Sequence, residues 1–180
     1  MRVELNLKQN TKEWLQSREN KVTGSNAILL LTGDYQTALE ANSKTFNGNF
    51  WTQRGHILED EAVEIYNAIH DTELKRAGVV TNTRWPNAQC SPDAEDENRD
   101  ALIEVKCLKL DNHIRESKSP SAKYVAQSNF NALICGRKKA IMVFYCPDDN
   151  LQPEQQFIEV DVTNKAIQAN IKRRLKYALQ

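Results

Sequence analysis

The spacing of apolar residues changes near Gly78, from the period of helices to the period of strands. Before Gly78, a helix is predicted from about residue 52 to residue 70, because its apolar residues recur at intervals of three and four. They define one buried face, made of Leu58, Ala62, Ile65, Tyr66 and Ile69. After it come runs with the composition of strands, at 79–81, 87–91 and 101–107, with the acidic segment 93–100 as a hairpin turn. The remaining predicted elements are a helix over 120–135, strands over 140–146 and 157–162, and a helix over 163–179. This order predicts an α/β (α+β) fold in which a mixed sheet is flanked by helices.

Capping residues mark three further short helices near the N-terminus. Thr11, Ser25 and Asp34 each precede an apolar stretch and are residue types that accept hydrogen bonds from the first turn of a helix. No repeat or Pro/Gly-rich linker divides the sequence, which favours one domain over residues 1–180. We expect a helical part over 1–78, a sheet core over 79–162 and a C-terminal helix over 163–180.

The composition excludes several classes of protein. The 24 basic and 24 acidic side chains give zero formal charge, so the chain is not held on nucleic acid by total charge, although a local basic groove is possible. No apolar run is long enough to cross a membrane, and the first residues lack the apolar core of a secretory signal, which predicts a cytoplasmic protein. The four cysteines lie far apart without a Cys-x-x-Cys pair, which argues against zinc or an iron–sulfur cluster.

Two carboxylates and a lysine form the strongest candidate site. In the predicted strand 103–107, Glu104 and Lys106 share one face, and the apolar residues between them take the other. Asp93 follows Ser91 and a proline at the end of the preceding strand, so its carboxylate is expected beside Glu104 if the two strands adjoin. Close carboxylates repel unless a cation lies between them, and Mg²⁺ is the hard cation that prefers such oxygen ligands. Taken alone, each residue more often caps a turn or faces solvent.

Other polar residues are placed to assist such a site. Glu59 borders the buried face of the predicted helix 52–70, and Tyr124 and Gln127 stand three apart on one helix face. Ser25 can cap a helix, or it can present its hydroxyl to a phosphate together with the planar guanidinium of Arg18. For each of these residues, solvent exposure or capping is the common alternative.

Taken in order, these motifs resemble the lambda-exonuclease group, also called YqaJ-like viral recombinases. The segments that carry the resemblance are Arg18…Gly24-Ser25, Gly55…Glu59, Ser91-Pro92-Asp93, Ile103-Glu104-Val105-Lys106-Cys107 and Tyr124…Gln127. The group has a restriction-endonuclease-like PD-(D/E)xK core, so the resemblance implies a single nuclease domain. It also implies a magnesium-dependent deoxyribonuclease, with Mn²⁺ as a substitute, that digests linear duplex DNA from 5′ ends.

The resemblance assigns roles residue by residue. Glu59, Asp93, Glu104 and the backbone carbonyl of Val105 would bind metal. Lys106 would position or activate water, and Gln127 would lie near the active site. A 5′-phosphate or nearby DNA would be held by Arg18, Ser25, Ser91 and Tyr124.

The resemblance also implies partners and a source. These are duplex DNA ends, a single-strand annealing protein, a homo-oligomeric ring trimer, and a phage or prophage gene expressed in the cytoplasm of a bacterial host. An endonuclease or resolvase-like enzyme of the same superfamily is the nearer alternative, and an inactive DNA- or partner-binding scaffold is the more distant one.

The sequence departs from the family pattern in three ways. Ala94 stands where glycine is common, and Leu108 replaces a frequent proline. The acidic segment from Glu95 to Asp100 would repel a phosphate backbone, so we expect it to face away from DNA.

Overall fold

The computed structural model describes residues 1–7, 11–41 and 50–177, and within them it contains two mixed sheets of four strands. One sheet has the order β1 (Arg2–Leu5), β3 (Val79–Asn82), β4 (Trp85–Cys90), β2 (Val22–Thr23). The other has the order β5 (Ala94–Asp96), β6 (Ala101–Cys107), β7 (Lys139–Tyr145), β8 (Phe157–Asp161). β6 and β7 are parallel, whereas β5 and β8 pair antiparallel at the two edges. The predicted mixed α/β fold is confirmed, with two sheets in place of one.

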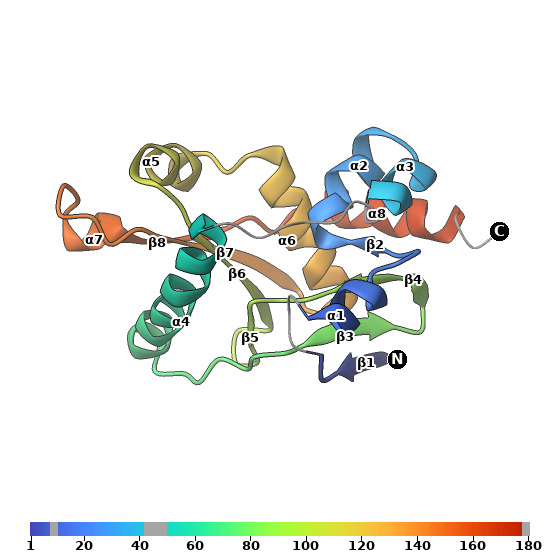
Figure 1. Ribbon diagram of the computed structural model, residues 1–180, viewed down its shortest axis with the longest axis horizontal. Helices are drawn as coiled ribbons and strands as arrows, with labels where there is room; N and C mark the ends of the chain where they lie inside the picture. Colours follow the sequence, from blue (N-terminus) through green and yellow to red (C-terminus); the bar gives the residue numbers. More distant parts are fainter. Residues whose placement is uncertain (8–10, 42–49, 178–180) are drawn as a thin grey trace.

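Helices cover both sheets (Figure 1). They are α1 (Lys12–Ser17), the 3₁₀ turn η1 (Gly24–Asn26), α2 (Ala27–Thr32), α3 (Tyr35–Glu40), α4 (Phe50–His70), α5 (Leu110–Lys118), α6 (Ala122–Cys135), α7 (Pro153–Gln156) and α8 (Lys165–Tyr177). Thr11 and Asp34 cap α1 and α3 as predicted, since their side chains accept hydrogen bonds from the backbone N–H groups of Trp14 and Thr37. Gly136 ends α6 in the left-handed conformation, with φ of 78°, which glycine adopts without strain.

β6 lies between two apolar clusters and is buried on both faces. Ile103 and Val105 pack in the cluster that contains Tyr66 of α4, which confirms the predicted core face of this strand. Leu102 points the other way, into the cluster that contains Phe130 of α6. Burying one such side chain contributes about 1.5–3 kcal/mol. The face of Glu104 is therefore also covered, by α6, and is not a solvent-facing edge.

The hairpin around the acidic segment differs from the prediction. β4 and β6 belong to different sheets, and the strand that pairs with β6 in a hairpin is β5. Glu95 and Asp96 are therefore strand residues, fully buried, and the turn is limited to residues 97–100. The prediction was wrong because acidic residues favour turns locally, whereas here two arginines distant in sequence neutralise Glu95 and the Tyr66 hydroxyl donates to Asp96.

Those arginines hold Glu95 from two sides. Arg2 Nη2 and Nη1 donate to its two oxygens at 2.5 and 3.0 Å, and Arg137 Nε donates at 2.6 Å. The turn residue Glu97 accepts from the same Arg137 at 3.2 Å. These contacts turn much of the acidic charge of the segment into internal ion pairs.

A second polar network joins the same hairpin to α4 and β8. Tyr66 donates to Asp96 at 3.0 Å, and Arg99 donates to the Tyr66 hydroxyl at 2.6 Å. Arg99 also binds Glu159 at 2.6 Å, and His70 lies 2.7 Å from that carboxylate. The hairpin that follows Asp93 is thus fixed on both sides by charged hydrogen bonds.

The remaining predictions concern cysteines and membrane helices. All four cysteines are free thiols, and the Sγ atoms of Cys90 and Cys135 lie 3.4 Å apart in the core. Burial, followed by the hydrogen bond with Cys135, raises the pKa of the Cys90 thiol well above its usual value. In the described part of the chain, no helix has the length and apolar character needed to span a membrane.

Candidate active site

Glu104 is the most heavily bonded carboxylate of the candidate site. It lies on β6 and is 2% exposed. Its Oε1 accepts from Lys106 Nζ at 2.6 Å and from Gln127 Nε2 in a short hydrogen bond, and its Oε2 accepts from Asn131 Nδ2 at 3.0 Å. The predicted proximity of Glu104, Lys106 and Gln127 is therefore present, with a fourth residue added.

Asp93 is bound to the backbone of the same strand. It follows Pro92 directly, and its Oδ2 accepts from the backbone N–H of Val105 at 2.8 Å. Burial, and then the negative charge of Glu104, raise the pKa of Asp93 well above its usual value. The two carboxylates thus interact across Val105, and their proximity favours a cation between them.

Lys106 is the cation that the chain itself supplies. Burial would lower its pKa, but the charges of Glu104 and Asp93 outweigh burial, and the net shift is upward. Its ammonium also lies 5.5 Å from the ring centroid of Tyr124, within range of a cation–π contact. Lys106 is therefore charged at neutral pH, and the structure places Tyr124 next to it.

Glu59 is not grouped with these acids. Its carboxylate accepts from Arg76 Nη1 at 3.2 Å, and Arg76 also binds Asp60 at 2.5 Å. Across the described residues, no three His, Cys, Asp or Glu side chains form a group that would hold a metal ion. Glu59 is nevertheless near enough for its charge to raise the pKa of Asp93, so its assignment as a ligand stays a prediction.

The predicted phosphate-binding residues form a second group. Arg18 Nη2 donates to Ser25 Oγ at 2.9 Å and to Thr23 Oγ1 at 3.2 Å, and the two hydroxyls lie 3.0 Å apart. The prediction that Ser25 starts a helix by capping is wrong, because no side-chain cap is present at η1 or α2 and its hydroxyl faces Arg18. Burial lowers the pKa of Arg18, although a guanidinium remains charged at neutral pH.

Trp14 joins Ser91 to this group. The Arg18 guanidinium carbon lies 4.4 Å from the centroid of the Trp14 ring, and the indole Nε1 donates to Ser91 Oγ at 2.9 Å. One side chain therefore orients two predicted phosphate ligands that are far apart in the sequence.

The two groups meet where η1 touches α6. A Cβ added to Gly24 would overlap with Asn131 Oδ1, so the absence of a side chain at Gly24 allows this close approach. Asn131 is 2% exposed and also donates to Glu104. The predicted phosphate-binding residues and the cluster around Glu104 are thus separated by a single amide side chain.

Sequence reasoning missed Thr23, Trp14 and Asn131. Asn131 follows Gln127 by four residues, so the periodicity that puts Tyr124 and Gln127 on one face also includes it. Nothing local to Trp14 or Thr23 indicates their role, since their partners depend on how α1 and β2 pack.

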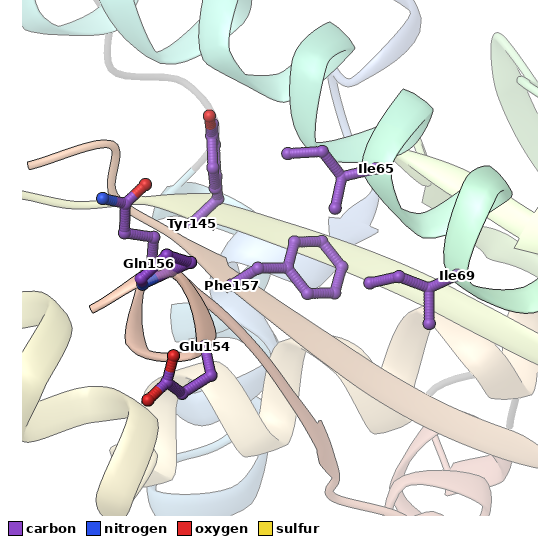
Figure 2. A pocket seen from close by; sticks show the side chains of 7 residues that line it. Ile65, Ile69, Tyr145, Glu154, Gln156 and Phe157 are labelled. Atoms are coloured by element: carbon purple, nitrogen blue, oxygen red, sulfur yellow. The ribbon is translucent and has the colours of Figure 1, made fainter. Parts of the chain in front are cut away.

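A separate pocket of about 500 Å³ lies at the C-terminal end of α4 (Figure 2). Ile65 and Ile69 of α4 face Phe157 and Tyr145 across it, and none of the site residues described above lines it. Ile69 was predicted on the buried face of its helix, but it is 58% exposed and lines this pocket.

Comparison with known proteins gives one family and several similar structures. The sequence model of the YqaJ-like viral recombinase domain matches residues 13–138. No curated protein matches the chain. The alkaline exonuclease LHK-Exo from Laribacter hongkongensis has a TM-score of 0.76 and 25% identity, covering 94% of this chain and 91% of that one. The same coverage and identity hold for LHK-Exo in complex with dAMP, with a TM-score of 0.77.

A phage-related exonuclease from Haemophilus somnus 129PT shares the fold. Its TM-score is 0.65 at 17% identity, covering 91% of this chain and 94% of that one.

Proposed function

Because this chain belongs to the YqaJ-like viral recombinase family, we propose that it is a magnesium-dependent exonuclease that digests linear duplex DNA from 5′ ends. The observation that carries the proposal is the cluster of Asp93, Glu104, Lys106 and Gln127 on and around β6. A deoxyribonuclease needs charge neutralisation beside a group that positions water, and this cluster offers both.

The donor set fits a magnesium ion. Asp93 and Glu104 supply carboxylate oxygens, and the raised pKa of Asp93 reflects burial and an excess of negative charge that a cation would relieve. We propose that these two residues, with the carbonyl of Val105, hold the ion, and that Glu59 contributes after leaving Arg76. A bound ion would neutralise charge on the scissile phosphate and on the leaving oxygen.

Lys106 and Gln127 act on the water and the phosphate. The ammonium of Lys106 is held by Glu104 and can donate to a phosphate oxygen or orient a water beside it. The amide of Gln127 fixes the same carboxylate and can also accept from that water. The charged state of Lys106 suits stabilisation of negative charge, and proton removal would require a metal's field to lower its pKa.

The second group is suited to a terminal phosphate. Arg18 offers a planar guanidinium, and the hydroxyls of Thr23, Ser25 and Ser91 offer neutral hydrogen bonds nearby. The dAMP complex of LHK-Exo shows that a nucleoside monophosphate binds to that similar protein. We propose that Arg18, Ser25 and Ser91 hold the 5′-phosphate of the DNA end, with Tyr124 contacting DNA beside Lys106.

Digestion of defined DNA ends tests this function. Linear duplexes with a 5′-phosphate or a 5′-hydroxyl, and a covalently closed circle, are incubated with Mg²⁺ or with a chelator. We expect loss of linear DNA only with Mg²⁺, faster from the phosphorylated end, and no loss of the circle. Cleavage of the circle would instead support an endonuclease, and equal rates at both ends would contradict the role of Arg18 and Ser25.

Lys106→Ala tests the proposed site directly. This variant should abolish cleavage and still bind duplex DNA, because Arg18, Ser25 and Ser91 remain to hold the DNA end. Unchanged hydrolysis in this variant would rule out the proposed site.

The proposed function extends to the oligomeric state, the protein partner and the cellular location of the enzyme. We propose that the enzyme acts on DNA ends as a homo-oligomer, together with a single-strand annealing protein, in the cytoplasm of a bacterial host that carries a phage or prophage. Light scattering of the purified protein tests the oligomer, and a mass of one chain at working concentration would contradict a ring.

A further inference from the structure

Asn131 has two neighbours with different chemistry. Its Nδ2 donates to Glu104 Oε2 at 3.0 Å, and its Oδ1 faces Gly24 so closely that a Cβ there would overlap with it. We propose that Asn131 is a positioning residue that fixes the Glu104 carboxylate and the Gly24–Ser25 segment relative to each other. This inference rests on the proposed function and adds to it a physical link between the metal site and the phosphate site.

The hydrogen bonds of Glu104 show what Asn131 controls. A carboxylate has about four lone-pair directions. Lys106 and Gln127 occupy Oε1, and Asn131 occupies one direction of Oε2. Oε2 is therefore the oxygen with a direction left for a cation, and Asn131 sets its orientation.

Gly24 shows how the Asn131 side chain contacts the predicted phosphate-binding residues. Gly24 lies between Thr23 and Ser25, the two hydroxyl residues that accept from Arg18. Within the described residues, Asn131 Oδ1 has no hydrogen-bond donor although it is buried. The Oδ1 atom that faces Gly24 and the Nδ2 atom that donates to Glu104 belong to one planar amide, so a shift at Gly24 is transmitted to Glu104.

The neighbouring Asn129 illustrates a structural asparagine on the same helix. Its Nδ2 donates to the carbonyls of Val125 and Val162, and its Oδ1 accepts from Asn164 N and from Gln168. These bonds join α6 to the start of α8. Asn131 instead uses its donor on a buried carboxylate of the candidate metal site.

The first test measures Mg²⁺ binding without DNA. The melting temperature of wild type, Asn131→Ala and Ser128→Ala is followed against Mg²⁺ concentration, and the affinity is taken from the concentration dependence. Ser128 is fully buried on the same helix and serves as the control. We expect Mg²⁺ affinity to fall about tenfold or more in Asn131→Ala, as for groups that orient metal ligands, and to stay unchanged in Ser128→Ala.

The second test changes Gly24, the residue that Asn131 Oδ1 faces. In Gly24→Ala, the new methyl group pushes the amide away from Glu104, so we expect a similar loss of about tenfold in Mg²⁺ affinity. In the double variant Gly24→Ala/Asn131→Ala, the overlap is relieved and no further loss should occur. Additive losses, or a Gly24→Ala variant with wild-type Mg²⁺ affinity, would overturn the link.

The outcomes separate this inference from the proposed function. If wild type binds Mg²⁺ but degrades no DNA, the function fails while the affinity comparison still tests Asn131. If wild type degrades DNA and Asn131→Ala matches Ser128→Ala in Mg²⁺ affinity, the function stands and the positioning role is wrong. A folding defect in Asn131→Ala would show in the metal-free melt, and Gly24→Ala then supplies the independent measurement.

Discussion

Glu95 offers a sharp test of how the hairpin next to the candidate active site is held. It lies two residues after Asp93, is fully buried, and accepts hydrogen bonds from Arg2 and Arg137. Glu95→Gln keeps the size of the side chain but removes its charge, and it replaces one acceptor oxygen with an NH₂ group that faces a guanidinium. We expect this change to destabilise the protein strongly.

The magnitude follows from the contacts. Breaking a buried ion pair by removing one partner costs about 3–5 kcal/mol. The side chains of Arg2 and Arg137 are 25% and 14% exposed, so water compensates part of the loss and favours the lower end, about 3 kcal/mol. For a chain of 150–250 residues, each kcal/mol shifts the melting temperature by about 2–4 °C, so we expect a fall of about 6–12 °C.

Thermal unfolding followed by circular dichroism measures this fall, and Glu97→Gln is the matched control. Glu97 accepts from the same Arg137 at 3.2 Å, but its side chain is 63% exposed. An exposed pair contributes at most about 1 kcal/mol, so this variant should melt within about 4 °C of wild type. If both variants melted at the same temperature, burial of Glu95 would not be the source of its stabilising effect.

Three further outcomes are expected. Without metal, Asp93→Asn should melt no lower than wild type, because burial and a neighbouring carboxylate raise the pKa of Asp93 and make its ionised form costly. With metal, this variant should lose the stabilisation that Mg²⁺ gives to wild type, which is about 1.4 kcal/mol at a Mg²⁺ concentration of ten times the dissociation constant. Burial alone would raise the pKa of Glu159, but its hydrogen bonds, first the one from Arg99, lower it. Ionised Glu159 therefore stabilises the folded protein fully above the unfolded pKa near 4.5, and this stabilisation is lost as the pH falls through the lower pKa of the folded state. Glu159→Gln should therefore unfold about 1 kcal/mol more easily in urea at pH 7, with a smaller difference near pH 3. Trp14→Phe keeps the ring under the guanidinium but loses the hydrogen bond to Ser91, so the preference for 5′-phosphorylated ends should fall about two- to tenfold.

Features set by neighbouring residues were predictable. The caps at Thr11 and Asp34 and the end of α6 at Gly136 follow from local backbone and side-chain chemistry. The alternation that separates Glu104 from Val105 follows from strand geometry. These features depend on few contacts distant in sequence.

Features set by distant neighbours were not predictable. The assignment of β4 and β6 to different sheets depends on β1, β2 and β7, none of which adjoins them in sequence. The buried position of Glu95 depends on Arg2 and Arg137.

The site shows the same division. The residue types of each motif were readable in the sequence. Asp93 and Glu104 do lie close enough to interact, although the two strands that were expected to adjoin, β4 and β6, belong to different sheets. The pairing of Glu59 with Arg76 arises only when the loop after α4 folds back onto that helix, and the contact of Gly24 with Asn131 arises only when η1 packs against α6. The residue types of the candidate site were thus readable from the sequence, whereas the neighbours that contact and orient them were not.

The parallel pairing of β6 with β7 has a consequence for the order of folding. The connection between these strands spans residues 108–138 and includes α5 and α6, so the chain must close a long loop before the strands can pair. The β5–β6 hairpin closes only a short loop. During refolding, pulsed hydrogen exchange should therefore protect β5 before β7, and the face that holds Glu104 should be completed late, when α6 docks.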